Sequence, residues 1–302
     1  MTVRFDAAAP YEVDETDVTF ARPGGQDLLA RVYRPRGPAA APLAGIVDVH
    51  GGAWARGDHT TGALHGKALA ASGLVVVSVG FRQAPDHRYP TPNVDVSAGV
   101  RYVRAHAAEL GVDAARIGLV GSSSGGQVAL AVGLEPGAAA HAGTPAVLPD
   151  GSLDGGRGDD SVAAVLALYP VADPLARYRY VQGREHEPPP PSGFDAKRLL
   201  ASHLAYFADE AQMAAASVTG AVASGRASAR PPVWVAQPEL DDNVPAEITE
   251  AFVKAYRAAG GTLEHAPFPG ARHGFIQQAS PDADKAIALM RDFIGRHLVR
   301  QR

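Results

Sequence analysis

The chain has 302 residues, of which 46% are hydrophobic and 20% charged, with a formal net charge of −4 and a sequence pI of about 6.2. This composition supplies a large core and argues against nucleic acid or an acidic membrane surface as a partner. The sequence contains no cysteine, which excludes disulfide bridges and thiolate metal sites.

The chain opens with MTVRFDAAAPYEVDE, which lacks the apolar core of a signal peptide. No apolar run approaches the length needed to span a bilayer. These two features predict a cytoplasmic protein with no membrane partner.

Beyond this opening, strands and helices are expected to alternate. Apolar, β-branched runs predict strands at 17–22, 28–35, 44–52, 74–81, 116–123, 161–171, 230–239 and 262–270. Helical spacing predicts helices at 59–72, 94–110, 124–134, 245–260 and 281–298. The first two strands flank a glycine turn and read as an antiparallel pair. The alternation that follows predicts an α/β fold, with a mostly parallel sheet and helices on both faces.

Two segments interrupt this alternation, although residues 1–302 still read as one domain. Residues 135–160 are rich in Gly, Pro and Asp, which predicts a flexible surface loop. Residues 175–230 contain a proline run and then an alanine-rich helical stretch. This second segment is too long for a simple crossover and is expected to form a cap or lid above the sheet.

A G-x-S-x-G pattern at residues 121–125 lies where a predicted strand meets a predicted helix. This position argues against a flexible linker, and the absence of a P-loop lysine argues against a phosphate loop. A helix N-cap remains an alternative, because serine caps helices well. In a nucleophile elbow, the central serine of the pattern occupies a strained turn and needs small neighbours. The hypothesis is therefore that Ser123 is a nucleophile.

A serine hydroxyl needs a base, and the base needs an acid that orients it. In a fold with this elbow, the acid and then the histidine follow the serine at later strand ends. His273 follows the last predicted strand, and acidic residues follow the strand before it. Asp241, Asp242 and Glu239 are all candidates there, and Asp173 is a rival after an earlier strand.

The segment HGGAW at residues 50–54 is a glycine loop after a strand, which can offer backbone N–H groups to an oxyanion. The expected donors are the N–H groups of Ser124, Gly52 and Ala53, with Gly51 as an alternative. His50 is expected to brace the loop rather than act as a base. A zinc site would have to use the side chains of His50, Asp58, His59 and His65. Their spacing fits no common ligand pattern, so no metal or cofactor is expected.

With these residues placed, the sequence resembles the α/β-hydrolase superfamily, and within it the hormone-sensitive-lipase-like esterases and their kynurenine-formamidase relatives. The motifs that carry the likeness are H-G-G-x-W at 50–54, G-x-S-x-G at 121–125, and H-G-F at 273–275. The segment FRQAPDHRYPTPNVDV at 81–96 also matches, and there the resemblance implies a structural role for Asp95 at a helix start. DDNVP at 241–245 looks like the D-x-x-V-P acid loop of many α/β-hydrolases, which implies that Asp241 is the catalytic acid.

The sequence departs from the lipase-like pattern at the elbow, where GSSSGG replaces G-D-S-A-G-G. The hydroxyls of Ser122 and Ser124 are extra relative to that pattern, and Ser122 is expected to steady the elbow through a local hydrogen bond. No counterpart of the N-terminal cap helices of the lipase-like group is expected here, so the acyl pocket is expected either to be more open or to be roofed by residues 175–230.

The resemblance implies a serine hydrolase that cleaves small or medium acyl esters through an acyl-enzyme. An aryl formamidase, an amidase or a small peptidase with the same triad is the first alternative. A non-catalytic binding protein is more remote, because all three triad members are present. Trp54, Tyr178 and Tyr180 are candidate substrate contacts. Arg177 and Arg179 could attract acidic substrates, but a solvated surface pair is the favoured interpretation. The expected partner is a small ester or amide. The sequence itself does not determine the oligomeric state, but the resemblance implies that the last strand and helix could form the surface of a homodimer.

Overall fold

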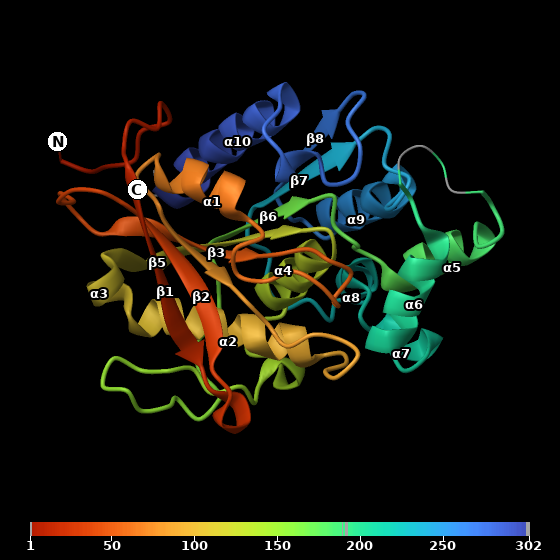
Figure 1. Cartoon of the computed structure of the whole chain (residues 1–302), viewed down its shortest axis with the longest axis horizontal. Coiled ribbons are helices and arrows are strands. Elements are labelled where there is room, and N and C mark those ends of the chain that lie inside the picture. The colour runs from red at the N-terminus through yellow and green to blue at the C-terminus, as the bar shows by residue number, and fades with distance from the viewer. Residues whose placement is uncertain (1, 189, 191–192, 300–302) are drawn as a thin grey trace.

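A single twisted sheet forms the centre of the molecule, with its strands in the order β1-β2-β4-β3-β5-β6-β7-β8 (Figure 1). The computed structural model describes residues 2–188, 190 and 193–299. Within them the strands are β1 (Val13–Ala21), β2 (Leu28–Pro35), β3 (Leu43–Val49), β4 (Val75–Val79), β5 (Val112–Ser122), β6 (Ala164–Leu168), β7 (Val233–Pro238) and β8 (Leu263–Phe268). β2 pairs antiparallel with both β1 and β4, and all other pairs are parallel. The predicted α/β class and mostly parallel sheet are confirmed.

Helices cover both faces of this sheet, so the central strands are buried along their whole length. Successive side chains of β3 therefore face two different cores. Val47 belongs to the core under one set of helices, and Ile46 to the core under the other. The first set is α2 (Thr91–Ala105), α4 (Ser124–Leu134), α8 (Val218–Ala223) and α9 (Ala246–Ala258), and the second is α1 (Ala63–Ala70) and α10 (Pro281–Ile294).

Short helical elements complete the main body. The helix expected over 94–110 is divided into α2 and α3 (Ala107–Leu110), and it ends at Gly111 in the left-handed conformation (φ 70°). The remaining single turns are η1 (Pro23–Gly25), η2 (Ala139–His141), η3 (Phe275–Gln277) and η4 (Gly295–Val299). No helix among the described residues combines the length and the apolar composition that crossing a membrane requires.

The segment expected to form a cap is a group of short helices that lies beyond one end of the strands (Figure 1). It contains α5 (Pro174–Gly183), α6 (Ala196–Tyr206) and α7 (Glu210–Ala215), and it returns to the main body through α8. The alanine-rich stretch thus forms three separate helices, α6, α7 and α8. Asp209 and Ser217 break it, because each side chain accepts a hydrogen bond from a backbone N–H of the helix that follows.

Residues 135–160 pack against α2 through buried polar groups. The Arg101 guanidinium pairs with Asp154 at 2.7 Å and donates to the carbonyl of Thr144, and Ser97 donates to Asp160 at 2.6 Å. The Asp95 carboxylate receives Arg82 and the Thr144 hydroxyl. These contacts tie the loop to the body at several points, and its flexibility stays a prediction.

Candidate active site

Ser123 occupies the turn between the last residue of β5 and the first residue of α4, with φ 54° and ψ −119°. A positive φ is strained for a residue with a side chain, and such strain gathers at functional sites. The turn requires small neighbours. A Cβ on Gly121 would lie 2.4 Å from the Gly125 carbonyl oxygen, and a Cβ on Gly125 would lie 2.2 Å from the His50 carbonyl oxygen. The local geometry is that of the nucleophile elbow expected from the sequence.

Three loops at the carboxyl ends of β5, β7 and β8 bring Ser123, Asp241 and His273 together. The Ser123 Oγ lies 2.9 Å from the Nε2 of His273, and the His273 Nδ1 lies 2.9 Å from the Oδ2 of Asp241 and 3.1 Å from its Oδ1. The hydroxyl, the imidazole and the carboxylate are therefore hydrogen-bonded in series. This is the arrangement in which an imidazole takes the proton of an attacking hydroxyl.

The Asp241 carboxylate is held in place by the loop that follows β7. Its Oδ1 accepts from the backbone N–H groups of Asn243 at 3.0 Å and Val244 at 2.8 Å, and its side chain is 1% exposed. The rival acid, Asp173, instead accepts from the N–H of Ala176 and caps α5. Only the Asp241 carboxylate is in contact with His273, whereas the Asp173 carboxylate caps a helix. The residue pattern alone had left both as candidates for the acid.

The loop after β3 presents its backbone beside Ser123. Gly52 has φ 123°, and Ala53 and Trp54 have φ 54° and 58°, so the chain coils tightly here. Gly52 is required, because a Cβ would lie 2.0 Å from the Arg56 carbonyl oxygen. Within the described part of the chain, no acceptor is paired with the N–H groups of Gly52, Ala53 or Ser124. Three free donors next to a strained serine are suited to stabilising an oxyanion.

Side chains lock this loop in place from two sides. The His50 ring stacks on Phe81, with centroids 4.1 Å apart, and its Nδ1–H donates to the Gly51 carbonyl at 2.7 Å. Burial lowers the pKa of His50 and so favours the neutral ring, although the bond to the Gly51 carbonyl acts in the opposite direction. The Ser124 hydroxyl accepts from the Trp54 N–H at 3.2 Å. Sequence reasoning treated that hydroxyl as extra and missed this contact, since only tertiary structure places residue 54 beside residue 124.

Ser122 lies directly beneath the oxyanion loop, and a Cβ on Gly51 would be 3.2 Å from its Oγ. The neighbouring Tyr169 is fully buried and turns its ring edge toward His273, with centroids 4.7 Å apart. Ser122 thus belongs to the support of the elbow and the loop, and its side chain interacts with the Tyr169 hydroxyl.

A cavity of about 200 Å³ adjoins the triad, between the oxyanion loop and the cap. It is lined by Gly52, Ala53, Arg56, Ser123, Arg177, Arg198, Leu199, Asn243, His273 and Gln277. Trp54, Tyr178 and Tyr180 are not among the described residues that line this cavity, and their contact with substrate stays a prediction. Trp54 is fully buried, donates to Gln127 at 3.1 Å and stacks on Tyr206 of α6, with ring centroids 4.9 Å apart. The Tyr180 hydroxyl donates to the Asp242 carbonyl, and the Tyr178 ring packs on His203.

The two arginines of α5 differ in their surroundings, which corrects the expectation of a solvated pair. Arg179 is exposed and pairs with Glu210 at 2.9 Å. Arg177 is only 1% exposed and faces the cavity. Helical periodicity explains the difference, because residues two apart lie on different faces of a helix. The sequence reading treated them as neighbours because α5 was not predicted as a helix.

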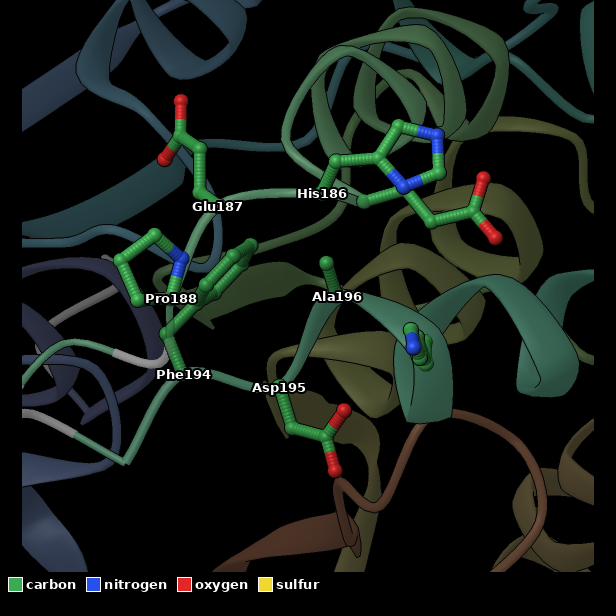
Figure 2. A pocket seen from close by; sticks show the side chains of 8 residues that line it. His186, Glu187, Pro188, Phe194, Asp195 and Ala196 are labelled. Atoms are coloured by element: carbon green, nitrogen blue, oxygen red, sulfur yellow. The ribbon is translucent and has the colours of Figure 1, made fainter.

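Another cavity, of about 310 Å³, lies within the cap at the start of α6. Figure 2 shows His186 and Glu187 on one side of it and Phe194 and Asp195 on the other. The described residues that line it include no member of the triad and no strained serine. The smaller cavity at the strand ends is therefore the candidate site.

The parallel sheet, the elbow and the triad geometry are those of an α/β-hydrolase fold. Comparison with known proteins gives the same fold family. Residues 46–277 match the alpha/beta hydrolase fold family, and the chain belongs to this family. The match covers the oxyanion loop, the elbow, the acid loop and the histidine.

Named relatives narrow the comparison. The chain is 29% identical over 257 residues to "Esterase LipC" of Mycobacterium tuberculosis, covering 82% of this chain and 57% of that protein. It is 27% identical over 295 residues to "Ethyl acetate hydrolase" of Pseudomonas putida, covering 94% of this chain and 83% of that protein. This chain therefore spans just over half the length of the first relative and most of the second.

Among solved structures, EstE1, a carboxylesterase from a metagenomic library, superposes with a TM-score of 0.73 at 25% identity. That match covers 96% of this chain and 92% of EstE1. A Pyrobaculum calidifontis esterase gives a TM-score of 0.73 at 24% identity, over 95% of this chain and 87% of that one, and supports the fold alone.

Proposed function

We propose that this protein is a serine hydrolase that cleaves carboxylic esters of small or medium acyl groups. The observation that carries the proposal is the hydrogen-bonded series Ser123–His273–Asp241, with Nε2 of His273 2.9 Å from the serine Oγ. The names of the relatives, an esterase and an ethyl acetate hydrolase, support an ester as the substrate.

In the proposed mechanism, Ser123 attacks the ester carbonyl while His273 takes its proton. Asp241 holds the imidazole in the correct tautomer and stabilises the imidazolium. The negative oxygen of the tetrahedral intermediate is placed against the N–H groups of Gly52, Ala53 and Ser124. His273 then protonates the leaving alcohol, and a water molecule repeats the sequence on the acyl-enzyme.

The test compares the wild-type enzyme with Ser123→Ala on a series of p-nitrophenyl esters of increasing acyl length. We expect the substitution to lower kcat by at least about 10³-fold on every ester. A fluorophosphonate should label the wild type at Ser123, as located by mass spectrometry of peptides, and should leave the variant unlabelled. Near-normal turnover by Ser123→Ala would refute the assignment.

The same assay can decide between ester and amide chemistry. N-formylkynurenine and aminoacyl anilides are the amide arms of the series. Faster turnover of these compounds than of any ester, lost in Ser123→Ala, would replace the esterase assignment by a formamidase or amidase using the same triad. The cytoplasmic location and the homodimer stay predictions from the sequence.

A further inference from the structure

Three guanidinium groups converge on the cavity beside the triad. Arg56 comes from the oxyanion loop, Arg177 from α5 and Arg198 from α6. The cap helices α5 and α6 lie next to each other (Figure 1). Each of these two helices contributes one arginine to the cavity. A protein with a net charge of −4 thus places positive charge where its substrate must enter.

Arg177 is a buried cation whose hydrogen bonds go to neutral groups. Its Nε donates to the Asn243 carbonyl at 3.2 Å, its Nη1 to His203 Nε2 at 3.1 Å, and its Nη2 to the Asn243 amide oxygen. Burial lowers the pKa of Arg177 to about 10, so the group is still charged at neutral pH. The acid whose charge it feels is Asp241, which already binds His273 and two backbone N–H groups.

Arg56 and Arg198 have little or no carboxylate compensation. Among the ion pairs of the described residues, none includes Arg56. Arg198 lies 4.0 Å from Asp195, a 52% exposed carboxylate that also caps the start of α6. Partial burial and the nearby charge of Arg56 lower the pKa of Arg198, which shows that the two cations repel each other.

Holding like charges together without an anion is unfavourable, and a bound anion would relieve the repulsion. Guanidinium groups bind carboxylates with charge-assisted, often bidentate hydrogen bonds. The remaining lining supports a small polar ligand, since Asn243 and Gln277 carry amides and, among the described residues, Leu199 is the only large apolar side chain that lines the cavity.

We propose that the ester carries a carboxylate on the part that enters this cavity, and that Arg56 and Arg198 bind it while Arg177 supports the positive field. This inference rests on the proposed function and adds a substrate class to it: half-esters of dicarboxylic acids, or acylated hydroxy acids. Arg56 and Arg198 are the substrate-binding residues, Arg177 acts only through its charge, and none of the three takes part in proton transfer.

The test uses isosteric pairs of esters and a pH-stat assay at low ionic strength. Monomethyl glutarate against methyl valerate places the charge on the acyl side. 4-Acetoxybutanoate against butyl acetate places it on the alcohol side. The measured quantity is the ratio of kcat/KM for the anionic ester to kcat/KM for its neutral partner, in the wild type, Arg56→Gln, Arg198→Gln and Arg198→Lys. Arg179→Gln is the matched control, because that arginine lies on α5 but pairs with Glu210 away from the cavity.

We expect the wild type to prefer the anionic member of at least one pair, and Arg198→Gln to lower that ratio by about tenfold or more. Arg56→Gln should lower it in the same direction. Arg198→Lys should retain more of the ratio than Arg198→Gln, and Arg179→Gln should leave it unchanged. Added salt should reduce the ratio toward one.

A wild-type ratio below one for both pairs, or ratios that Arg198→Gln does not move, would overturn the inference. In that outcome, Ser123-dependent hydrolysis of the neutral esters would leave the proposed function intact. Failure of the proposed function is distinguishable, because then no ester of either kind would be hydrolysed in a manner that depends on Ser123.

Discussion

The carboxyl edge of the sheet and the cap above it are built differently and serve different ends. At the sheet edge, backbone geometry holds the reacting groups: a strained serine, a glycine-dependent loop and an aspartate fixed by two N–H groups. In the cap, side-chain contacts hold the structure together, through stacked aromatic rings and a buried arginine. The difference suggests that the sheet sets the chemistry and the cap sets what is brought to it. Changes at the edge should therefore affect all substrates alike, and changes in the cap should alter stability or selectivity.

The largest effect should come from the acid at the sheet edge. We expect Asp241→Asn to lower kcat by about 10³- to 10⁴-fold on every ester, because the carboxylate no longer orients and stabilises the imidazolium. The fold should survive, since the amide oxygen can still accept from the N–H of Val244. Measuring kcat for several acyl lengths checks both the size and the uniformity of the loss.

Asp173→Asn is the control for that experiment, because Asp173 is the N-cap residue of α5 and does not contact His273. It should leave kcat within a few-fold of the wild type. A loss as large as that of Asp241→Asn would show that the acid has been misassigned.

A smaller effect should appear in the pH dependence of stability and should come from the cap. Burial, followed by the charge of Arg177, lowers the pKa of His203 to about 2. The unfolded chain binds a proton at this residue below about pH 6.5, whereas the folded chain does not. Stability should therefore fall as the pH decreases from about 6.5, by about 1.4 kcal/mol per pH unit for this one site.

His203→Gln removes that proton while keeping an acceptor for Arg177. Urea denaturation between pH 6 and 4.5 should show a slope of unfolding free energy against pH that is smaller by about one proton than in the wild type. His186→Gln, at an exposed position in the same cap, should leave the slope unchanged. An unaltered slope in His203→Gln would mean that the ring does not stay neutral in the folded cap.

The smallest effect concerns Trp54, which joins the two regions. Trp54→Phe keeps the aromatic stack on Tyr206 but loses the 3.1 Å hydrogen bond to Gln127. We expect a loss of about 1–3 kcal/mol in unfolding free energy, because the Gln127 acceptor is left buried and unpaired. KM should change little and by the same factor along an acyl-length series. A KM change that grows with acyl length would show instead that the indole contacts substrate.

The resemblance and the residue patterns together anticipated much of the site. The sequence predicted the strand-to-helix transition around Ser123 and the order serine, acid, histidine. Both could be predicted because a parallel sheet places the carboxyl ends of its strands at one edge. The choice of Asp241 over its neighbours required the resemblance. Three features could not be predicted from the sequence, because each depends on a partner far away in the chain. They are the role of the Ser124 hydroxyl, the burial of Trp54 and the direction of the Arg177 side chain.

The sequence by itself predicted the fold class, the elbow at Ser123 and the order serine, acid, histidine, because those features follow from local periodicity, small residues at a strained turn and chain order. Only the tertiary structure decided which side chains line the cavity. Three arginines separated by as many as 142 positions in the chain meet there. Their convergence depends on how α5 and α6 pack over the oxyanion loop, and packing between elements distant in sequence leaves no periodic signal in the order of residues.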